Sequence, residues 1–432
     1  MDNVFQSQVD LIREVFNYQS RFEGSTMVFK IDCPVTETRG FSSLVKDLAL
    51  LAKTGFKVVI VPGARENIDA VLKQHDISSV YAKIPDDAST HDFSVRVTTQ
   101  QTIPFVEMAA FNTASRFMTL LSGSRVEALI GNFVRARGLG VINGVDTEHT
   151  GTVDKIYDDS LVRVLNLGMV PILPCIGWSP SGKPYNVPSD EIALAVSKAL
   201  GAAKLFIVTA HDGLNITKLT PAEAEELLKS NTITEQQFQR DIKLSIKASQ
   251  AGVHRVHIID GREEGSVLKE LFSNLGAGTM IYADEHDSVR SLHSRDLPDI
   301  LRLMEPLMQK GILIRRNPEQ ILEKKNDYAI LEIDGSIRAC GALHEWGESQ
   351  GEIAAVATDP QYKDLGLGRK IVGYLIEKAK KHKLNRVFVL TTQSQDWFES
   401  LGFEETTVET LPEKKRKIYD QNRKSKVYAL GL

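Results

Sequence analysis

A short segment with two glycines has the residue types of a phosphate-binding loop. Residues 359–370 read DPQYKDLGLGRK, and Gly366 and Gly368 stand directly before a helix-like run. The first backbone N–H groups of a helix have no partner within the helix, and the helix dipole favours an anion there. The segment is therefore a candidate phosphate site, although glycine pairs of this kind also occur in ordinary turns.

One side chain in the segment opposes this interpretation. The carboxylate of Asp364 would repel a phosphate, whereas Lys363 and Arg369 on either side more than offset its charge. Backbone N–H groups of about residues 364 to 369 would hold the anion, so side chains that point outward are free to vary. The conflict concerns the affinity for an anion and not the existence of the site.

The elements around this loop predict an α+β domain over residues 289–432. YAILEIDG and SIRACGALHEWG meet at Asp334-Gly335, which predicts a hairpin, and EIAAVATD is the next strand. The helix from Arg369 carries an apolar stripe that includes Ile371 and Leu375. The remaining elements are a strand VRSL, helices at 296–310 and 317–326, a strand RVFVLTT and a short helix QDWFESL.

Residues 27–282 are organised differently, because short apolar runs alternate with helix-period segments. The runs are MVFKID, KVVIVPG, MVPILPCIGW, KLFIVTA and RVHIIDG. Apolar strands that alternate with helices are typical of a mainly parallel sheet covered on both faces. We therefore expect an αβα sandwich over residues 23–284, preceded by an amphipathic helix within residues 1–22.

The composition of the 432-residue chain excludes several classes of protein. Hydrophobic residues make up 42% and charged residues 25%, as in a globular protein. The net charge of −4 gives no footprint for nucleic acid, and no apolar run reaches the ~18 residues of a membrane span. The three cysteines lack metal-ligand spacing and indicate reduced thiols, a cytoplasmic location and no metal. The lysines of the basic stretch 414–426 are interpreted as mostly solvated surface charge.

The order of elements after residue 288 resembles the GCN5-related N-acetyltransferase fold. The pyrophosphate loop of that family follows the pattern [Arg/Gln]-x-x-Gly-x-[Gly/Ala], from which Lys363 and Asp364 depart. The whole chain, an amino-acid-kinase-like domain followed by this domain, resembles the bacterial N-acetylglutamate synthases. The segments that carry this resemblance are GILIRR (311–316), RVFVLTTQSQDWFESLGF (386–403), LPEKKRKIYDQNRKSKV (411–427), PGAR (62–65) and LFSNLGAGTMI (271–281).

The resemblance implies acetyl transfer from acetyl-CoA to the amino group of L-glutamate, the first step of arginine biosynthesis. Backbone N–H groups near the acetyl group would come from a bulge that separates EIAAVATD from its neighbouring strand. The residues implied for acetyl-CoA are Ala355, Val356, Ala357, Lys363, Asp364, Leu365, Gly366, Leu367, Gly368 and Arg369.

Two further residues are implied for proton transfer. The amine of glutamate is mostly ammonium at neutral pH, so a base must remove a proton before the nitrogen attacks the thioester. The resemblance implies Glu352 as this base, acting through water, and an exposed carboxylate at a strand start is the alternative. It implies Ser394 as the donor to the leaving thiolate, because Phe398 stands where many members of the superfamily have tyrosine. An ordinary helix N-cap is the alternative for Ser394.

Glutamate carries two carboxylates, and arginine side chains bind carboxylates with two parallel hydrogen bonds. The positions that match the family's glutamate site are Arg315, Arg316, Arg423 and Ser425. The sequence does not distinguish Arg315 from Arg316, and we favour Arg316.

The first domain lacks the glycine turns of a working amino-acid kinase. The family's Lys-x-Gly-Gly reads Lys30-Ile31-Asp32-Cys33, and the second glycine-rich turn reads Pro62-Gly63-Ala64-Arg65. A carboxylate and lost glycines oppose a closely held triphosphate, although Lys30, Asp190 and Lys218 remain at kinase-like positions.

The resemblance instead implies that the first domain binds L-arginine as a feedback effector. The matching positions are Tyr18, His257, Glu270, Gly276 and Gly278. A solvated helix carboxylate is the alternative for Glu270. The resemblance also implies a homo-oligomer, with a hexamer as the expected size and the N-terminal helix as a contact.

Two other functions stay open at this point. One is an acetylglutamate kinase with a tethered acetyltransferase fold, which the broken glycine turns oppose. The other is an arginine-sensing regulator with an inert acetyltransferase fold, which the intact candidates for base, thioester site and glutamate arginines oppose.

The substitution Asp364→Gly tests the interpretation of the loop. It removes a carboxylate beside the expected pyrophosphate, so the dissociation constant of acetyl-CoA should stay unchanged or fall. Calorimetric titration with acetyl-CoA measures this constant, and a clear rise would mean that the carboxylate supports the loop.

Overall fold

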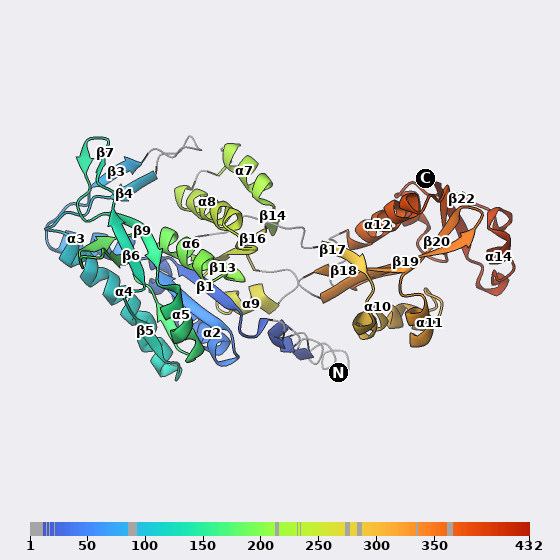
Figure 1. Cartoon of the computed structure of the whole chain (residues 1–432), viewed down its shortest axis with the longest axis horizontal. Coiled ribbons are helices and arrows are strands. Elements are labelled where there is room, and N and C mark those ends of the chain that lie inside the picture. Colours follow the sequence, from blue (N-terminus) through green and yellow to red (C-terminus); the bar gives the residue numbers. More distant parts are fainter. Residues whose placement is uncertain are drawn as a thin grey trace. The chain divides into compact units, whose positions relative to one another are not determined.

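The structure, a computed structural model, divides the chain into two compact units, Met1–Asp284 and Glu285–Leu432 (Figure 1). The residues that it describes are 12, 13, 15, 16, 18–20, 22–84, 93–211, 216–230, 232, 233, 235–272, 277–282, 287–333, 336–360 and 366–432. Most of the predicted N-terminal helix lies outside this set, and its described positions between 12 and 22 are helical.

The first unit is built on an eight-stranded sheet in which only the neighbours β15 and β16 run antiparallel. In spatial order its strands are β14 (Lys218–Leu219), β16 (Thr279–Tyr282), β15 (Arg255–Asp260), β13 (Lys204–Thr209), β1 (Thr26–Ile31), β2 (Lys57–Pro62), β10 (Val170–Ile172) and β5 (Ala128–Ile130).

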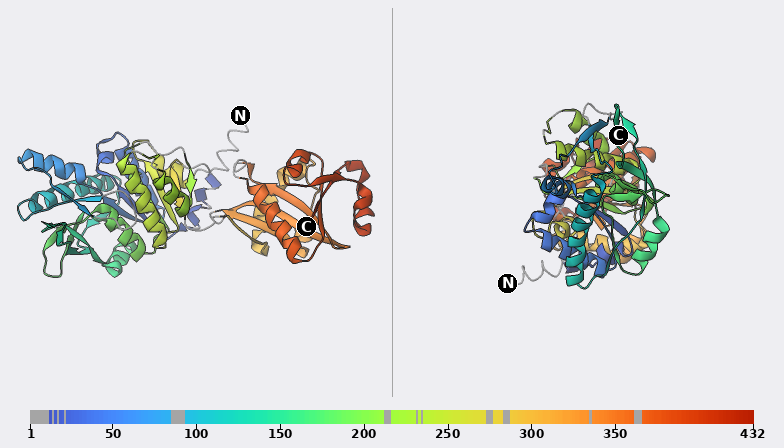
Figure 2. Two further views of the ribbon diagram at one scale, coloured as in Figure 1. Left: turned by 90° about the horizontal axis from the view of Figure 1, so that it is seen from above. Right: turned by 90° about the vertical axis from the view of Figure 1, so that its left-hand side faces the viewer.

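Helices cover both faces of this sheet (Figures 1 and 2). Alternate residues of each strand point to opposite faces, so Val28 packs in one core and its neighbours Met27 and Phe29 pack in the other. The core with Val28 contains residues of α5 (Asp158–Asn166), α6 (Ser189–Ala199), α7 (Pro221–Lys229) and α8 (Gln236–Gln250). The core with Phe29 contains residues of α2 (Phe41–Lys53), α4 (Ile103–Gly123) and α9 (Ser266–Phe272).

The apolar run MVPILPCIGW is not one strand but two, which belong to different sheets. Its first part is β10 of the large sheet, and its second part is β11 (Ile176–Trp178) of a four-stranded sheet. The other strands of that second sheet are β12 (Pro184–Asn186), β6 (Val134–Gly138) and β9 (Gly151–Ile156). The described residues of the unit also include two antiparallel strand pairs and a further helix. The pairs are β3 (Tyr81–Ile84) with β4 (Phe93–Arg96) and β7 (Val141–Ile142) with β8 (Val145–Asp146), and the helix is α3 (Arg65–Gln74).

The second unit contains a seven-stranded sheet in which only β20 and β21 run parallel. In spatial order its strands are β17 (Asp287–Ser291), β18 (Tyr328–Ile333), β19 (Ser336–Gly347), β20 (Gln350–Thr358), β21 (Arg386–Thr391), β23 (Lys426–Gly431) and β22 (Glu404–Thr406). Ile333 pairs with Ser336, which confirms the predicted hairpin, and its turn at 334–335 lies outside the described residues.

The first strands of this sheet lie between helices on both faces (Figure 1). α12 (Leu367–Lys381) packs on the face of Ala329 and Leu331, whereas α10 (Leu297–Gln309) and α11 (Pro318–Glu323) pack on the face of Ile330. Two further helices, α13 (Gln395–Glu399) and α14 (Glu413–Arg416), follow β21. The observed sheets and layers confirm the predicted αβα sandwich and α+β domain. Among the described residues, no helix combines the length and apolar character that crossing a bilayer requires.

One buried carboxylate of the first unit makes stability depend on pH. Asp47 of α2 is 9% exposed, and its Oδ2 has no hydrogen-bond partner among the residues that the structure describes. Burial raises the pKa of Asp47 from 3.8 to about 6. An acid whose pKa is higher in the folded state costs stability as the pH rises from about 4 to about 6, and the cost is constant above that window.

The substitution Asp47→Asn should therefore stabilise the first unit at pH 8 by on the order of 1–3 kcal/mol and much less at pH 4.5. Thermal midpoints of the full chain and the variant at both pH values measure the difference. An advantage that is equal at both pH values, or larger in acid, would contradict the assignment.

Candidate functional site

The two parallel strands of the second unit separate shortly after they meet. β20 pairs with β21 only over residues 350–352, opposite residues 386–388. β20 continues to Thr358 and β21 to Thr391, but no further pairs join these strands, which the structure describes over their full length. The edge of β20 beyond Glu352 therefore presents backbone groups that a ligand can pair with.

A bulge lies where the strands diverge. Ala355 has a φ of +54°, and the register between β19 and β20 shifts between the pairs Cys340–Ala357 and Ala342–Ala354. A left-handed alanine costs on the order of 1 kcal/mol, so the surrounding structure must hold it in place. The predicted bulge is present at residues 355–357, and its role toward an acetyl group stays a prediction.

The N-terminus of α12 follows the candidate phosphate loop. Gly366 is its N-cap, with a left-handed φ of +65°, and its carbonyl accepts the first helical bond, from Lys370 N–H at 3.1 Å. The N–H groups of residues 367–369 thus have no helical partner, which suits an anion. The helix begins at Leu367, two residues before the predicted start at Arg369. The other predicted loop residues, Lys363, Asp364 and Leu365, lie outside the described residues.

Close packing places α13 against this helix N-terminus. A Cβ atom at Gly368 would lie 2.9 Å from the ring of Trp397, so a larger side chain there would displace α13. Ser394 is the N-cap of α13, but its side chain makes no capping hydrogen bond. The hydroxyl, on a half-buried residue, is therefore not used as an ordinary cap.

The carboxylate of Glu352 is buried and accepts contacts from two side chains. The residue is 4% exposed, and Lys415 Nζ lies 2.8 Å from its Oε1 and 2.7 Å from its Oε2. Trp346 Nε1 donates a further hydrogen bond to Oε2 at 2.8 Å. The alternative of an exposed carboxylate at a strand start is thus wrong, because Glu352 is enclosed by three donor contacts.

Lys415 is a residue of this site that the sequence interpretation missed. It was included in the solvated basic stretch, but it is 7% exposed, and its Nζ lies 4.8 Å from the centre of the Trp346 ring. The neighbouring Lys414 and Lys417 are exposed, as predicted. A run of cations contains no periodicity that would single out one buried member, so the sequence offered no signal for it.

Two of the predicted glutamate-binding arginines lie near each other. Burial and then the charge of Arg316 lower the pKa of Arg423, which indicates two like charges in proximity. Arg423 Nη2 donates to the carbonyls of Gly311 and Ile312, and its buried Nε has no hydrogen-bond partner in the described parts of the chain. Arg316 is half-buried, whereas Arg315 is exposed.

Ser425 lies two residues after Arg423, at 7% exposure, and its carbonyl accepts a hydrogen bond from Tyr419 Oη at 2.6 Å. Arg316, Arg423 and Ser425 therefore belong to one part of the second unit, and Arg315 points to solvent.

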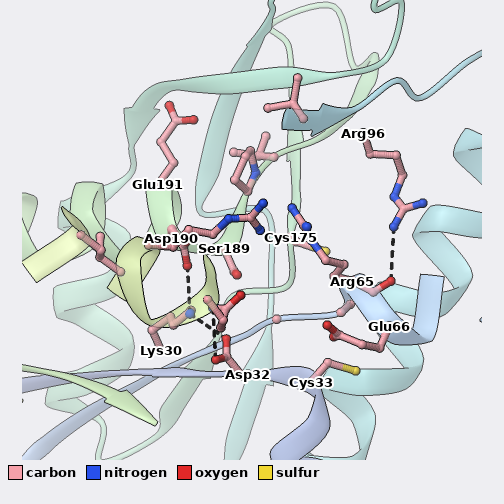
Figure 3. Close-up of a pocket in the computed structure, with 18 of the residues that line it drawn as sticks. Lys30, Asp32, Cys33, Arg65, Glu66, Arg96, Cys175, Ser189, Asp190 and Glu191 are labelled. Carbon is pink, nitrogen blue, oxygen red and sulfur yellow. Dashed lines mark hydrogen bonds and ion pairs between the residues drawn. The ribbon is translucent and has the colours of Figure 1, made fainter. Parts of the chain in front are cut away.

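The first unit contains a cavity of about 650 Å³ at the carboxyl ends of its strands (Figure 3). Lys30 is fully buried there, and its Nζ lies 2.6 Å from Asp32, 3.0 Å from Asp190 and 3.4 Å from Asp241. Burial opposes the charge of Lys30, but the three carboxylates hold its pKa well above the usual value. Burial likewise raises the pKa of Asp32 to about 6. The charge of Lys30 is thus more than neutralised by the carboxylates that surround it.

Other features of this cavity also differ from the kinase-like expectation. Lys218 lies on the edge strand β14 and is not among the residues that line the cavity, whereas Lys243 of α8 is. Figure 3 shows Arg65 and Arg96 together on one side of the cavity, across from Asp190. No group of histidine, cysteine, aspartate or glutamate side chains in the described residues is arranged to hold a metal ion.

A second cluster of the first unit contains the predicted arginine-binding residues. Glu270 is 9% exposed and accepts hydrogen bonds from His257 Nδ1 at 2.5 Å and from the N–H groups of Ala277 and Gly278 at 2.5 and 3.0 Å. Burial lowers the pKa of His257. Burial would raise the pKa of Glu270, but His257 and the Ala277 N–H lower it overall.

The pair is therefore a carboxylate and a neutral imidazole whose Nδ1–H donates. Within the described part of the chain, the buried Nε2 of His257 is an acceptor without a hydrogen-bond partner. Glu270 is not a solvated helix carboxylate. The ring centres of Tyr18 and Phe272, the last residue of helix α9, lie 5.2 Å apart. Gly276 lies outside the described residues.

Comparisons with known proteins agree with both units. The model of the amino acid kinase family matches residues 27–260, and the model of the acetyltransferase (GNAT) family matches residues 288–403. The amino-acid acetyltransferases of Shigella flexneri and Escherichia coli K12 are each 34% identical to this chain over 449 aligned residues, which cover 98% of both partners.

Among solved structures, N-acetylglutamate synthase of Neisseria gonorrhoeae complexed with coenzyme A and L-arginine has a TM-score of 0.86 at 32% identity. The same enzyme complexed with coenzyme A and N-acetyl-glutamate has a TM-score of 0.62 at 33% identity, and each match covers 98% of this chain and 99% of the other. The resemblance found in the sequence is confirmed, and the chain belongs to the amino-acid acetyltransferase family.

Proposed function

We propose that this chain transfers the acetyl group of acetyl-CoA to the amino group of L-glutamate and releases N-acetyl-L-glutamate and CoA. The observation that carries the proposal is the divergence of β20 and β21 directly after the buried Glu352. The family and the related enzyme solved with coenzyme A and N-acetyl-glutamate support it. The product is the first intermediate of arginine biosynthesis.

Acetyl-CoA is a substrate in this proposal, and two backbone features would bind it. The N–H groups of residues 367–369 would donate hydrogen bonds to the pyrophosphate at the start of α12, and residues 363–366 would contribute the rest of the expected loop. The thioester oxygen gains negative charge when the amine attacks, and the N–H groups of Ala355, Val356 and Ala357 at the bulge would stabilise it.

Glu352 would accept the proton that the substrate ammonium loses, and the freed electron pair of the nitrogen would attack the thioester carbonyl carbon. The tetrahedral intermediate then expels the thiolate of CoA. Ser394, whose hydroxyl is not used as a cap, would donate its proton to this thiolate. The nitrogen of the intermediate loses its second proton as the amide forms, and this proton would restore the Ser394 hydroxyl.

The two carboxylates of glutamate would bind to Arg316, Arg423 and Ser425. Two guanidinium groups near each other repel, and the dianionic substrate relieves that repulsion. The exposed Arg315 is left out of the site.

The first unit would regulate the second and would not phosphorylate a substrate. Asp32, Asp190 and Asp241 form ion pairs with Lys30, so its positive charge is already compensated and is not available to a phosphate. L-arginine would bind at Tyr18, His257, Glu270 and residues 276–278, where the free Nε2 of His257 can accept a hydrogen bond from a guanidinium.

A homo-oligomer, expected to be a hexamer, would form through the N-terminal helix, where Ile12 and Phe16 are 54% and 64% exposed. The described cysteines Cys33, Cys175 and Cys340 are all buried and free, which agrees with a cytoplasmic enzyme.

The function is tested with two assays on the full chain. Acetyl-CoA with L-glutamate should release thiol, and addition of L-arginine should change the rate. ATP with N-acetyl-L-glutamate should release no ADP. No thiol release would refute the acetyltransferase, and ADP release would restore the kinase alternative.

The glutamate site is tested by Arg423→Gln. Loss of a charged hydrogen bond to a carboxylate costs about 1.5–3 kcal/mol, so the KM for glutamate should rise on the order of 10- to 100-fold. The KM for acetyl-CoA should change less than about twofold in the same steady-state measurement. The exposed neighbour Lys424 offers a matched control, because Lys424→Gln removes the same charge. Equal increases in both KM values would remove Arg423 from the site.

A further inference from the structure

The pair between Glu352 and Lys415 has a geometry that bears on proton transfer. A carboxylate has about four lone-pair positions, two on each oxygen. Lys415 contacts both oxygens of Glu352, and Trp346 also donates to Oε2. Three positions are thus occupied, and the fourth lies on Oε1. Among the contacts that the described residues make, the open position lies on Oε1, and a proton from the substrate can reach Glu352 there.

Burial makes the electrostatic interaction between Glu352 and Lys415 stronger than that of a surface ion pair. Glu352 and Lys415 are 4% and 7% exposed, and charges at such positions are weakly screened by solvent. The ammonium also lies 4.8 Å from the Trp346 ring centre, a cation–π contact that fixes it further. Removal of either partner would leave the other charge buried and uncompensated.

The other groups beside Glu352 do not replace Lys415. On β19, His344 pairs with Glu352 across the strands, but its Nδ1 bonds to Asp327 at 2.7 Å. On β21, the paired residue is the apolar Phe388. In the segment after β22, Tyr419 directs its hydroxyl to the carbonyl of Ser425. Among the described residues, the contacts of the Glu352 carboxylate thus include one cation.

Lys415 also connects two parts of the site. It lies on α14, and the same segment continues through residues 417–425 to Arg423 and Ser425. Leu411 and Tyr419 of this segment pack in one apolar cluster with Trp346 and Phe388. The segment that carries the proposed glutamate contacts is therefore joined to the proposed base by a buried ion pair.

We propose that Lys415 is the positioning residue of the acetyl-transfer reaction, an inference that rests on the proposed function. Its ammonium contacts both oxygens of Glu352, directs the open lone pair of Oε1 toward the incoming proton and joins the base to the glutamate-binding segment. The N–H bond of the substrate ammonium breaks, its electron pair stays on nitrogen for attack on the carbonyl, and its proton passes through water to Oε1.

The pH dependence of kcat distinguishes this role from a merely structural one. An opposite charge favours the ionised carboxylate, so Lys415→Met should make Glu352 retain its proton to higher pH. With both substrates saturating, we call the fall of kcat at low pH its acid limb. In the variant this limb should lie at a pH higher by about one unit or more. His344 is present in both proteins and cannot produce this difference.

Two further variants complete the test. Lys415→Arg retains the charge and should keep the acid limb within about 0.3 pH unit of the unsubstituted enzyme, although the kcat itself falls as the geometry changes. Lys414→Met removes a charge from the exposed neighbour and should leave the acid limb in place. Thermal midpoints and calorimetric binding of CoA report whether each variant is folded.

An unshifted acid limb in folded Lys415→Met would overturn the proposal, and so would an equal shift in Lys414→Met. If Lys415→Met does not fold, Lys415→Arg decides alone, because a shifted limb in that variant contradicts an electrostatic role and a retained limb supports it. Failure of the proposed function gives a different result, namely no thiol release by the unsubstituted enzyme.

Discussion

The chemistry of the second unit depends on the early end of pairing between β20 and β21. A sheet normally satisfies its backbone groups through neighbouring strands, and an interior gap is unfavourable unless something else fills it. Here the gap begins after three pairs, next to the left-handed Ala355. Backbone strain of this kind is often found at ligand-binding and catalytic sites, which agrees with the proposed acetyl-CoA site. The N-terminus of α12, the cap residue of α13 and the buried pair at Glu352 all belong to the elements that meet there.

The charged side chains of the two units differ in how far they compensate one another. In the first unit, three carboxylates surround Lys30, so the cavity that a kinase would use for phosphates presents a cation that is already neutralised. In the second unit, Arg316 and Arg423 lie close enough for their charges to repel, and the partners of Arg423 include backbone carbonyls. The charges around Lys30 already compensate one another within the folded protein. The two like charges of Arg316 and Arg423 repel, so the binding of an anion between them would be favourable.

Much of the fold followed from the sequence because long apolar runs and helical stripes have strong periodicity. The large sheet, the hairpin between β18 and β19 and the order of elements around Gly366 were all predicted. The four-stranded sheet was not, because its short, partly exposed strands lack that periodicity and part of it lies within MVPILPCIGW. The burial of Lys415 was also missed, because its partner Glu352 is 63 residues away and only tertiary structure joins them. The same applies to Arg315 and Arg316, which differ in exposure but not in residue type.

The place of β23 in its sheet has a consequence for how the protein is made. This strand comes last among the seven in the chain, yet it lies between β21 and β22 and pairs with both. While a ribosome is still translating residues 426–431, β21 has an unpaired edge and β22 has no neighbour. The first unit can fold as soon as its own strands have emerged, because domains fold as units during synthesis. The second unit must wait for its final strand, so a chain that stalls shortly before it exposes an aggregation-prone strand edge beside a finished first unit.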